Sequence, residues 1–188
     1  DESRNNYLLC VVYTTNAYGV SYVDVTTGDY YVTEFDSENK LLDEIGKTMP
    51  SEIICNDSFL VSGIDLDDLR DRLKIVISAI DAWHFEEDSC QKLLCKHFKV
   101  NTLTALGVDD FMAGQIAAGA VLAYLYETQK NSLSNITHLN PYIASKYMLL
   151  DSATRRNLEL TETLREKQKK GSLLWVLDKT KTAMGARL

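Results

Sequence analysis

The first 80 residues alternate between short apolar runs and polar stretches that contain turn-forming residues. Residues 7–14 (YLLCVVYT) are apolar on both alternating faces, which predicts a central β-strand buried on both sides. Residues 18–26 and 30–35 are β-rich runs joined by Thr27-Gly28-Asp29, the pattern of a hairpin. Residues 53–55 and 74–80 predict two further short strands. The pattern therefore predicts three antiparallel strands followed by two more.

Helical spacing separates the later strands of this region. Ser37 can cap a helix that carries Leu41 and Ile45 on one face and ends before Pro50. Asp65 can open a second helix before the last strand. Connections of this kind give a mixed sheet with helices on its faces. The arrangement suggests a ribonuclease H-like α/β domain, to which we assign residues 1–97.

The pattern becomes mostly helical after Trp83. Residues 89–98 and 109–130 are predicted helices, and the second is rich in small residues that let another element approach closely. Residues 141–150 are predicted to be extended, and helices are expected to begin at Asp151 and Ser172. We assign residues 98–188 to a mostly helical segment, so that the expected fold class is α/β plus α.

The charge is uneven along the chain. Of its 188 residues, 45% are apolar and 25% are charged, which is typical of a globular protein. The net charge of −7 divides into −11 over residues 1–97 and +4 over residues 98–188. Because phosphate groups are negatively charged, the acidic first half argues against tight nucleic-acid binding there.

Cysteine usage and the apolar runs limit the class of protein further. No CxxC pair or His cluster is present, so the spacing predicts no zinc site. Unpaired thiols in a chain without a signal peptide indicate a reducing compartment, and we expect a cytoplasmic protein. The longest apolar run, residues 116–126, is far shorter than the roughly 20 residues of a membrane span and predicts a buried helix. The four cysteines are Cys10, Cys55, Cys90 and Cys95.

A ribonuclease H-like sheet raises the possibility of a metal-dependent nuclease or resolvase. That chemistry holds two metal ions between clustered carboxylates, the first of them on the central strand. The central strand, residues 7–14, contains no Asp or Glu. Asp24 lies on the neighbouring strand and Asp57 follows the fourth. Since two separated carboxylates do not build a two-metal site, we expect no catalytic residue and no metal ligand, and we keep the nuclease as the alternative.

Three other motifs are weak. Gly46-Lys47-Thr48 resembles the end of a phosphate-binding loop, but Leu41 stands where the loop needs its first glycine, so we expect no ATP site. Phe85-Glu86-Glu87 could be a base-stacking wedge, but its acids disfavour phosphate, and Trp83 and Phe85 are better interpreted as core aromatics. The basic run at residues 165–170 could contact phosphate, but a solvated helix end is the better interpretation.

Several segments resemble a known family. Residues 148–160 (MLLDSATRRNLEL), 171–178 (GSLLWVLD) and 182–188 (TAMGARL) closely resemble, in order and spacing, the start of the core domain of the MutS family of bacterial DNA mismatch-repair proteins. Residues 19–28 (GVSYVDVTTG) and 107–123 resemble the connector domain of that family more loosely. The resemblance implies a fragment of a larger protein, as does the start at Asp1. Residues 1–97 would be the connector domain, and residues 98–188 a helical linker and the truncated beginning of the core or lever domain.

The resemblance also implies a function. A connector joins the mismatch-reading part of the family to its levers and ATPase, and it contributes a contact surface for MutL. We therefore expect a non-enzymatic fragment with no cofactor of its own, whereas ATP and Mg²⁺ would belong to the parent protein. Its partners would be MutL, a second MutS subunit and, through other domains of the parent, mismatched duplex DNA, without a membrane. We expect residues 1–97 to carry any MutL contact, because their acidity suits a basic partner. Exposed acids such as Asp65, Asp67, Asp68 and Asp71 are the candidates, and the alternative is that the acidity serves only solubility.

Overall fold

The computed structural model describes residues 6–15, 17–129 and 133–143, all within the first of two compact units, Asp1–Ala144. The second unit, Ser145–Leu188, lies outside the described residues. The helices expected from Asp151 and Ser172 and the basic run at residues 165–170 fall there. The extended segment expected at residues 141–150 is described only as far as residue 143.

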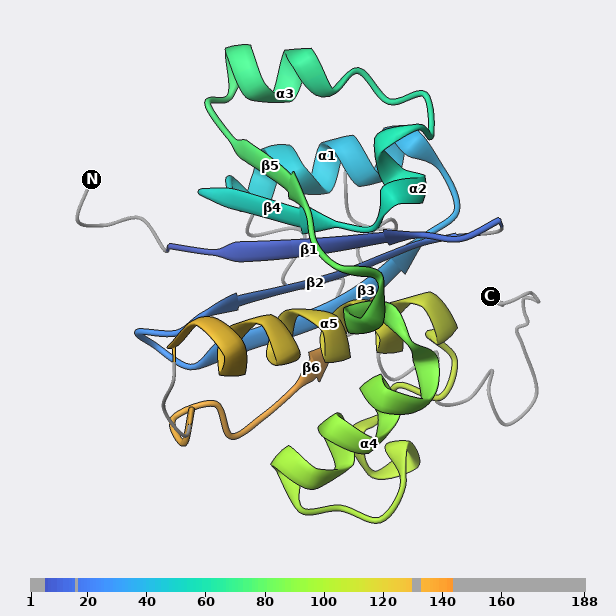
Figure 1. Cartoon of the computed structure of the whole chain (residues 1–188), viewed down its shortest axis with the longest axis vertical. Helices are drawn as coiled ribbons and strands as arrows, with labels where there is room; N and C mark the ends of the chain where they lie inside the picture. The colour runs from blue at the N-terminus through green and yellow to red at the C-terminus, as the bar shows by residue number, and fades with distance from the viewer. Residues whose placement is uncertain (1–5, 16, 130–132, 144–188) are drawn as a thin grey trace, which may run out of the picture. The chain divides into compact units, whose positions relative to one another are not determined.

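A mixed sheet of six strands forms the centre of the first unit, in the order β5-β4-β1-β2-β3-β6 (Figure 1). β1, β2 and β3 are antiparallel neighbours, whereas β4 and β5 continue the sheet beyond β1 in parallel. The last strand, β6, lies parallel to β3 and was not predicted. The expected mixed α/β sheet is confirmed. The strands are β1 (Leu8–Tyr13), β2 (Tyr18–Asp24), β3 (Asp29–Phe35), β4 (Glu52–Cys55), β5 (Val76–Ala79) and β6 (Asn140–Pro141).

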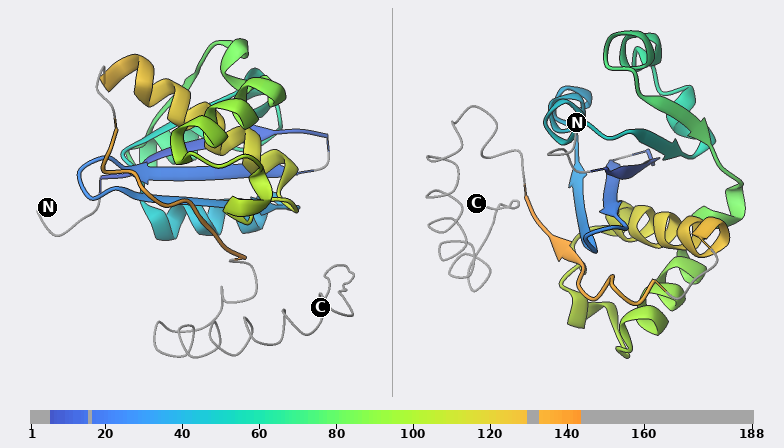
Figure 2. Two further views of the ribbon diagram at one scale, coloured as in Figure 1. Left: turned by 90° about the horizontal axis from the view of Figure 1, so that it is seen from below. Right: turned by 90° about the vertical axis from the view of Figure 1, so that its left-hand side faces the viewer.

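Helices cover both faces of the sheet, and Figures 1 and 2 show the resulting layers. One face packs against α1, α2 and α3, and the other against α4 and α5. The central strand serves both faces, since Leu9 and Val11 belong to the first core and Cys10 and Val12 to the second. The helices are α1 (Glu38–Thr48), α2 (Asp57–Leu60), α3 (Leu66–Arg72), α4 (Glu87–Phe98) and α5 (Met112–Gln129), with 3-10 turns η1 (Ala82–Phe85) and η2 (Leu103–Leu106).

Local signals placed most of these elements correctly. The Ser37 side chain accepts the backbone N–H of Lys40 at 3.2 Å, and the Asp65 carboxylate accepts that of Asp68 at 3.1 Å. Both are N-caps, as predicted, because a side-chain oxygen satisfies a helix N–H that has no partner within the helix. Gly28 takes a positive φ of 84° at the hairpin between β2 and β3, a conformation that favours glycine.

Helix α5 lies against the sheet so closely that only small residues fit. A Cβ added to Gly19 in β2 would lie 2.1 Å from the carbonyl oxygen of Ala113, and one added to Gly119 would lie 2.3 Å from the Cβ of Cys90 in α4. The expected boundary at residue 97 therefore does not coincide with a boundary of the structure. Residues 98–143 belong to the same unit as the strands, because α5 supplies the core of one sheet face.

The N-terminus of α5 is capped from the sheet. The Glu34 carboxylate of β3 accepts the backbone N–H groups of Ala113 at 2.9 Å and Gly114 at 3.0 Å. Burial raises the pKa of Glu34, and these two bonds offset only part of that rise. The bonds supply partners for two N–H groups that the helix itself cannot satisfy.

Candidate functional site

The two carboxylates considered for a nuclease do not form a joint site. Asp24 holds the turn after β2, since one oxygen accepts the N–H and the hydroxyl of Thr26, at 2.9 and 2.6 Å, and the other accepts the N–H of Asn6 at 3.2 Å. Burial alone would raise the pKa of Asp24, but these hydrogen bonds lower it below its usual value. Asp57 begins α2. Asp24 therefore has a local structural role, and Asp57 is an exposed residue of the first turn of a short helix.

No group of three or more His, Cys, Asp or Glu side chains within the described ranges is arranged to hold a metal ion. His97 instead contacts the hydroxyl of Tyr126 at 2.6 Å and the carbonyl of Ile136 at 2.8 Å. Burial raises the pKa of Cys55 to about 11 and that of Cys90 to about 12, so these thiols stay protonated. Together these observations disfavour the nuclease alternative.

The motifs at residues 46–48 and 85–87 lie within or at the ends of helical elements. Gly46-Lys47-Thr48 lies in the last turn of α1, where a helical backbone replaces the open loop that phosphate binding requires. Phe85 packs against the core beside α5, as expected, and Glu87 starts α4. The expectation that Trp83 is a core aromatic is wrong, because its side chain is 55% exposed.

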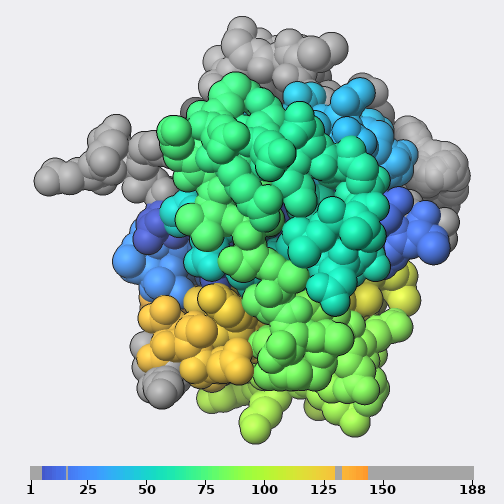
Figure 3. Space-filling model, turned by 45° about the horizontal axis from the view of Figure 1, so that its top comes forward, coloured from blue at the N-terminus to red at the C-terminus, as the bar shows by residue number. Residues whose placement is uncertain are grey.

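The acidic helix α3 stands at the surface of the unit (Figure 3). Asp65, Asp67 and Asp71 are exposed, whereas Asp68 forms a forked ion pair with Arg72, whose Nη2 lies 2.9 Å from Oδ2. This pairing lowers the pKa of Asp68. The helix thus presents three carboxylates to an approaching molecule, as the sequence predicted for this stretch.

A tyrosine cluster around the buried Tyr22 and Glu44 was missed in the sequence. The Tyr142 hydroxyl donates to Oε2 of Glu44 at 2.6 Å and lies 2.8 Å from the hydroxyl of Tyr22. Tyr22 also stacks on Tyr31, with ring centroids 5.2 Å apart. Glu44 is buried in α1, and its other oxygen lies 3.5 Å from the ammonium of Lys47. The sequence offered one signal for this cluster: Glu44 lies beside the apolar face of the predicted helix, where a charged side chain needs a partner.

Tyr142 belongs to a segment that we call the C-terminal strap, residues 133–143. Its backbone N–H donates to Val32 at 3.1 Å, and its carbonyl accepts the hydroxyl of Thr33 at 2.7 Å. The side-chain amide of Asn140 donates to the carbonyl of Tyr30 at 3.0 Å. The strap is therefore fixed along β3 by backbone and side-chain bonds, and Tyr142 anchors it beneath α1.

Comparisons with known proteins agree with this architecture. Residues 6–137 match the family model of MutS domain II, and residues 153–188 match that of MutS domain III. The whole chain is similar to proteins called DNA mismatch repair protein MutS: it is 58% identical to that of Lachnoclostridium phytofermentans, 46% to that of Ruminiclostridium cellulolyticum and 44% to that of Acetivibrio thermocellus. It spans only 20 to 22% of the length of these relatives.

The described helices include none long and apolar enough to cross a membrane. The tight sheet-and-helix unit matches domain II along almost its whole described length, and the relatives cover every residue of the chain. The chain therefore belongs to the MutS family of DNA mismatch repair proteins.

Proposed function

We propose that this chain is a non-catalytic connector and core segment that acts in cytoplasmic DNA mismatch repair. It couples mismatch binding to an ATPase located elsewhere in the parent protein and offers MutL a docking surface. The match of residues 6–137 to MutS domain II carries the proposal. A second MutS subunit is a further partner, whereas ATP, Mg²⁺ and mismatched DNA are bound by other parts of the parent. The nuclease alternative is not favoured, since Asp24 is engaged in its own turn.

The strand order supports the ribonuclease H-like assignment. An antiparallel meander, β1 to β3, is extended beyond β1 by two parallel strands, β4 and β5. In this proposal β6 is an addition at the opposite edge. In this proposal the fold serves as a scaffold, and its described residues include no cluster of the kind that holds metal ions in nucleases.

Close packing supports the coupling role. Well-packed interiors have low compressibility and transmit displacements. Here α5 touches β2 at Gly19 and α4 at Gly119, so the elements on that face cannot shift independently. A unit of this kind can move as one body between two distant sites, which is what coupling requires.

We predict that the acids of α3 accelerate MutL association. Replacing Asp65, Asp67 and Asp71 by Lys should slow association about tenfold at low salt, because these charges steer a basic partner. The effect should shrink as salt is added, since surface charges are screened over about 8 Å at physiological ionic strength. Association rates with MutL encoded in the same genome, measured by biolayer interferometry on the 188-residue chain, test this.

The control carries the same change of charge on another acidic stretch. Asp36, Glu38 and Asp43 are also exposed, and their replacement by Lys should change the rate much less. Equal slowing by both triple variants would contradict the prediction, because association would then depend on the net charge of the chain and not on the acids of α3. The whole chain is required, because α5 completes the core and a cut after residue 97 would remove it.

We also predict that the chain does not bind ATP. Gly46-Lys47-Thr48 is helical and its backbone groups are engaged in α1. Titration with Mg·ATP in a calorimeter should give only heat of dilution at concentrations up to about 1 mM, where a specific site would show binding. Saturable heat that Lys47→Ala removes would contradict the assignment.

A further inference from the structure

Trp83 is exposed but held rigidly. Its ring stacks on that of His84 with centroids 3.8 Å apart and an interplanar angle of 23°. His84 is buried, and its two ring nitrogens face the carbonyl of Asp81 at 3.0 Å and a carboxylate oxygen of Glu127 at 3.1 Å. One face of the indole is therefore supported, and more than half of the Trp83 side chain remains open to solvent. A rigid, exposed aromatic loses little entropy when a partner covers it.

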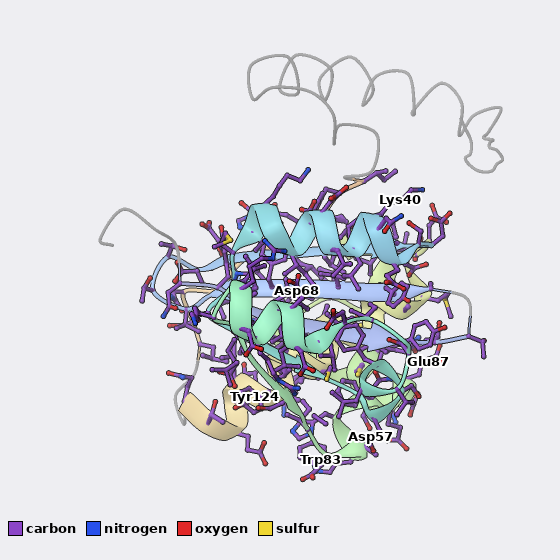
Figure 4. All side chains as sticks on the ribbon, turned by 90° about the horizontal axis from the view of Figure 1, so that it is seen from above. Lys40, Asp57, Asp68, Trp83, Glu87 and Tyr124 are labelled. Carbon is purple, nitrogen blue, oxygen red and sulfur yellow. The ribbon has the colours of Figure 1, made fainter. Side chains whose placement is uncertain are left out.

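Other apolar groups continue this surface toward the edge of the sheet. The Tyr124 ring lies 6.4 Å from that of His84, and Figure 4 shows the positions of Trp83 and Tyr124. Burial raises the pKa of Tyr124, and the negative charges of Glu52 and Glu127 raise it further. Glu52 is the register partner of Val76 in β5. Val76 is 61% exposed, and it points away from the core beside α1 to α3, to which its neighbours Ile75 and Ile77 belong. We call Val76, Trp83 and Tyr124 the Trp83 ridge.

Three carboxylates lie around the Trp83 ridge, and the cations Arg70 and Lys74 stand only near its Val76 end. Glu127 is half exposed and contacts the ring beneath Trp83, and Asp81 precedes the tryptophan and is exposed. Glu52 stands opposite Val76 in the strand register. An indole face attracts a cation, and a neighbouring carboxylate can accept its hydrogen bonds. Arginine fits both demands better than lysine, because its planar guanidinium stacks on the ring while its N–H groups point outward in the plane.

We propose that the Trp83 ridge is a docking surface for a partner protein that places an arginine on the open face of Trp83. The arginine pairs with the carboxylate of Glu127, and aliphatic side chains beside it cover Val76 and Tyr124. The inference rests on the proposed function, in which that partner is MutL.

The test measures MutL binding to variants of the 188-residue chain. Trp83→Ala should raise Kd by about 30-fold, mainly through faster dissociation, as expected when a central interface aromatic is lost. Trp83→Leu should be equally weak because it stays apolar but has no aromatic face, whereas Trp83→Phe should lose only about fivefold. Glu127→Gln should weaken binding about threefold at low salt and less at high salt.

Met112→Ala is the matched control. Met112 is as exposed as Trp83, at 54%, but begins α5 about 18 Å along the helix from Tyr124. Its truncation should leave Kd unchanged, and thermal melting confirms that each variant is folded.

The outcomes separate the ridge from the proposed function. Binding by Trp83→Leu as tight as that of the unaltered chain would overturn the arginine site. Unchanged binding by every Trp83 variant, together with slowing by the α3 variant, would overturn the ridge and leave the docking role intact. A chain that fails to bind MutL at all would overturn both.

Discussion

Gly119→Ala is expected to lower the free energy of unfolding by about 3 kcal/mol, the upper range for an overpacked core. The new methyl group would lie 2.3 Å from the Cβ of Cys90 and 2.7 Å from its Cα. Because the Cα is backbone, relief requires α4 and α5 to separate, which opens the core on that side of the sheet. The gain of about 1 kcal/mol in helix propensity does not offset this cost. Urea denaturation of the two proteins measures the difference.

Gly46→Ala is the control for that experiment. Gly46 also lies inside a helix, α1, but a Cβ there would meet no atom within 4 Å. The same chemical change should stabilise the protein by about 0.5–1 kcal/mol, since alanine loses less backbone entropy than glycine. If the two substitutions changed stability alike, the close approach of α5 to α4 would be wrong.

Tyr142→Phe is expected to lower the free energy of unfolding by about 2 kcal/mol, a typical loss for a hydrogen bond to a charged group. The substitution removes the donor to the buried Glu44 carboxylate and the partner of the Tyr22 hydroxyl. It should also speed hydrogen exchange at the backbone amide of Tyr142, because the C-terminal strap then opens more easily. Chemical denaturation and exchange measured by mass spectrometry or NMR provide the two readouts.

Tyr31→Phe serves as its comparison. Tyr31 contributes to the same cluster through its ring, which stacks on Tyr22 and lies edge-on to Tyr142. Removing its hydroxyl should change stability by less than about 0.5 kcal/mol. If Tyr142→Phe cost no more stability than Tyr31→Phe, the bond of Tyr142 to Glu44 would not be what holds the strap.

Sequence reasoning succeeded where a structural cause is local. Ser37 and Asp65 cap helices with their own side chains, so their roles are contained within four residues. Gly28 marks a turn that few other residues can form. The strands β1, β2 and β3 are rich in apolar residues, and most of their residues are buried in the sheet. These elements and their order could be predicted, and with them the α/β class.

The extent of the unit could not be predicted from local signals. The change of pattern after Trp83 suggested a new domain, but α5 returns to the sheet from residue 112. One signal was available: α5 is apolar nearly all round, and such a helix must be buried on several sides. Strand β6 is only two residues long and includes Pro141, so nothing periodic marks it. Its partner lies more than 100 residues earlier in β3.

The candidate surfaces divide in the same way. The acids of α3 lie close together in the sequence, so they could be predicted as a docking surface without knowledge of the fold. The Trp83 ridge depends on neighbours from β5, η1 and α5, which meet only in the folded chain. A tryptophan beside His84 and Phe85 is compatible in sequence with a core position. Its exposure follows from the buried His84, which fills the space beneath it.

The parallel pairing of β6 with β3 has a mechanical consequence. A pull on the chain after Ile143 along the strand axis strains the bonds of Asn140 and Tyr142 to β3 at the same time, in shear. The Glu44 anchor of Tyr142 resists together with them. A sideways pull instead breaks the same bonds one after another, beginning at Tyr142. The unit therefore resists traction along its strands more strongly than peeling, and the direction of an applied force decides whether the sheet moves with the strap or releases it.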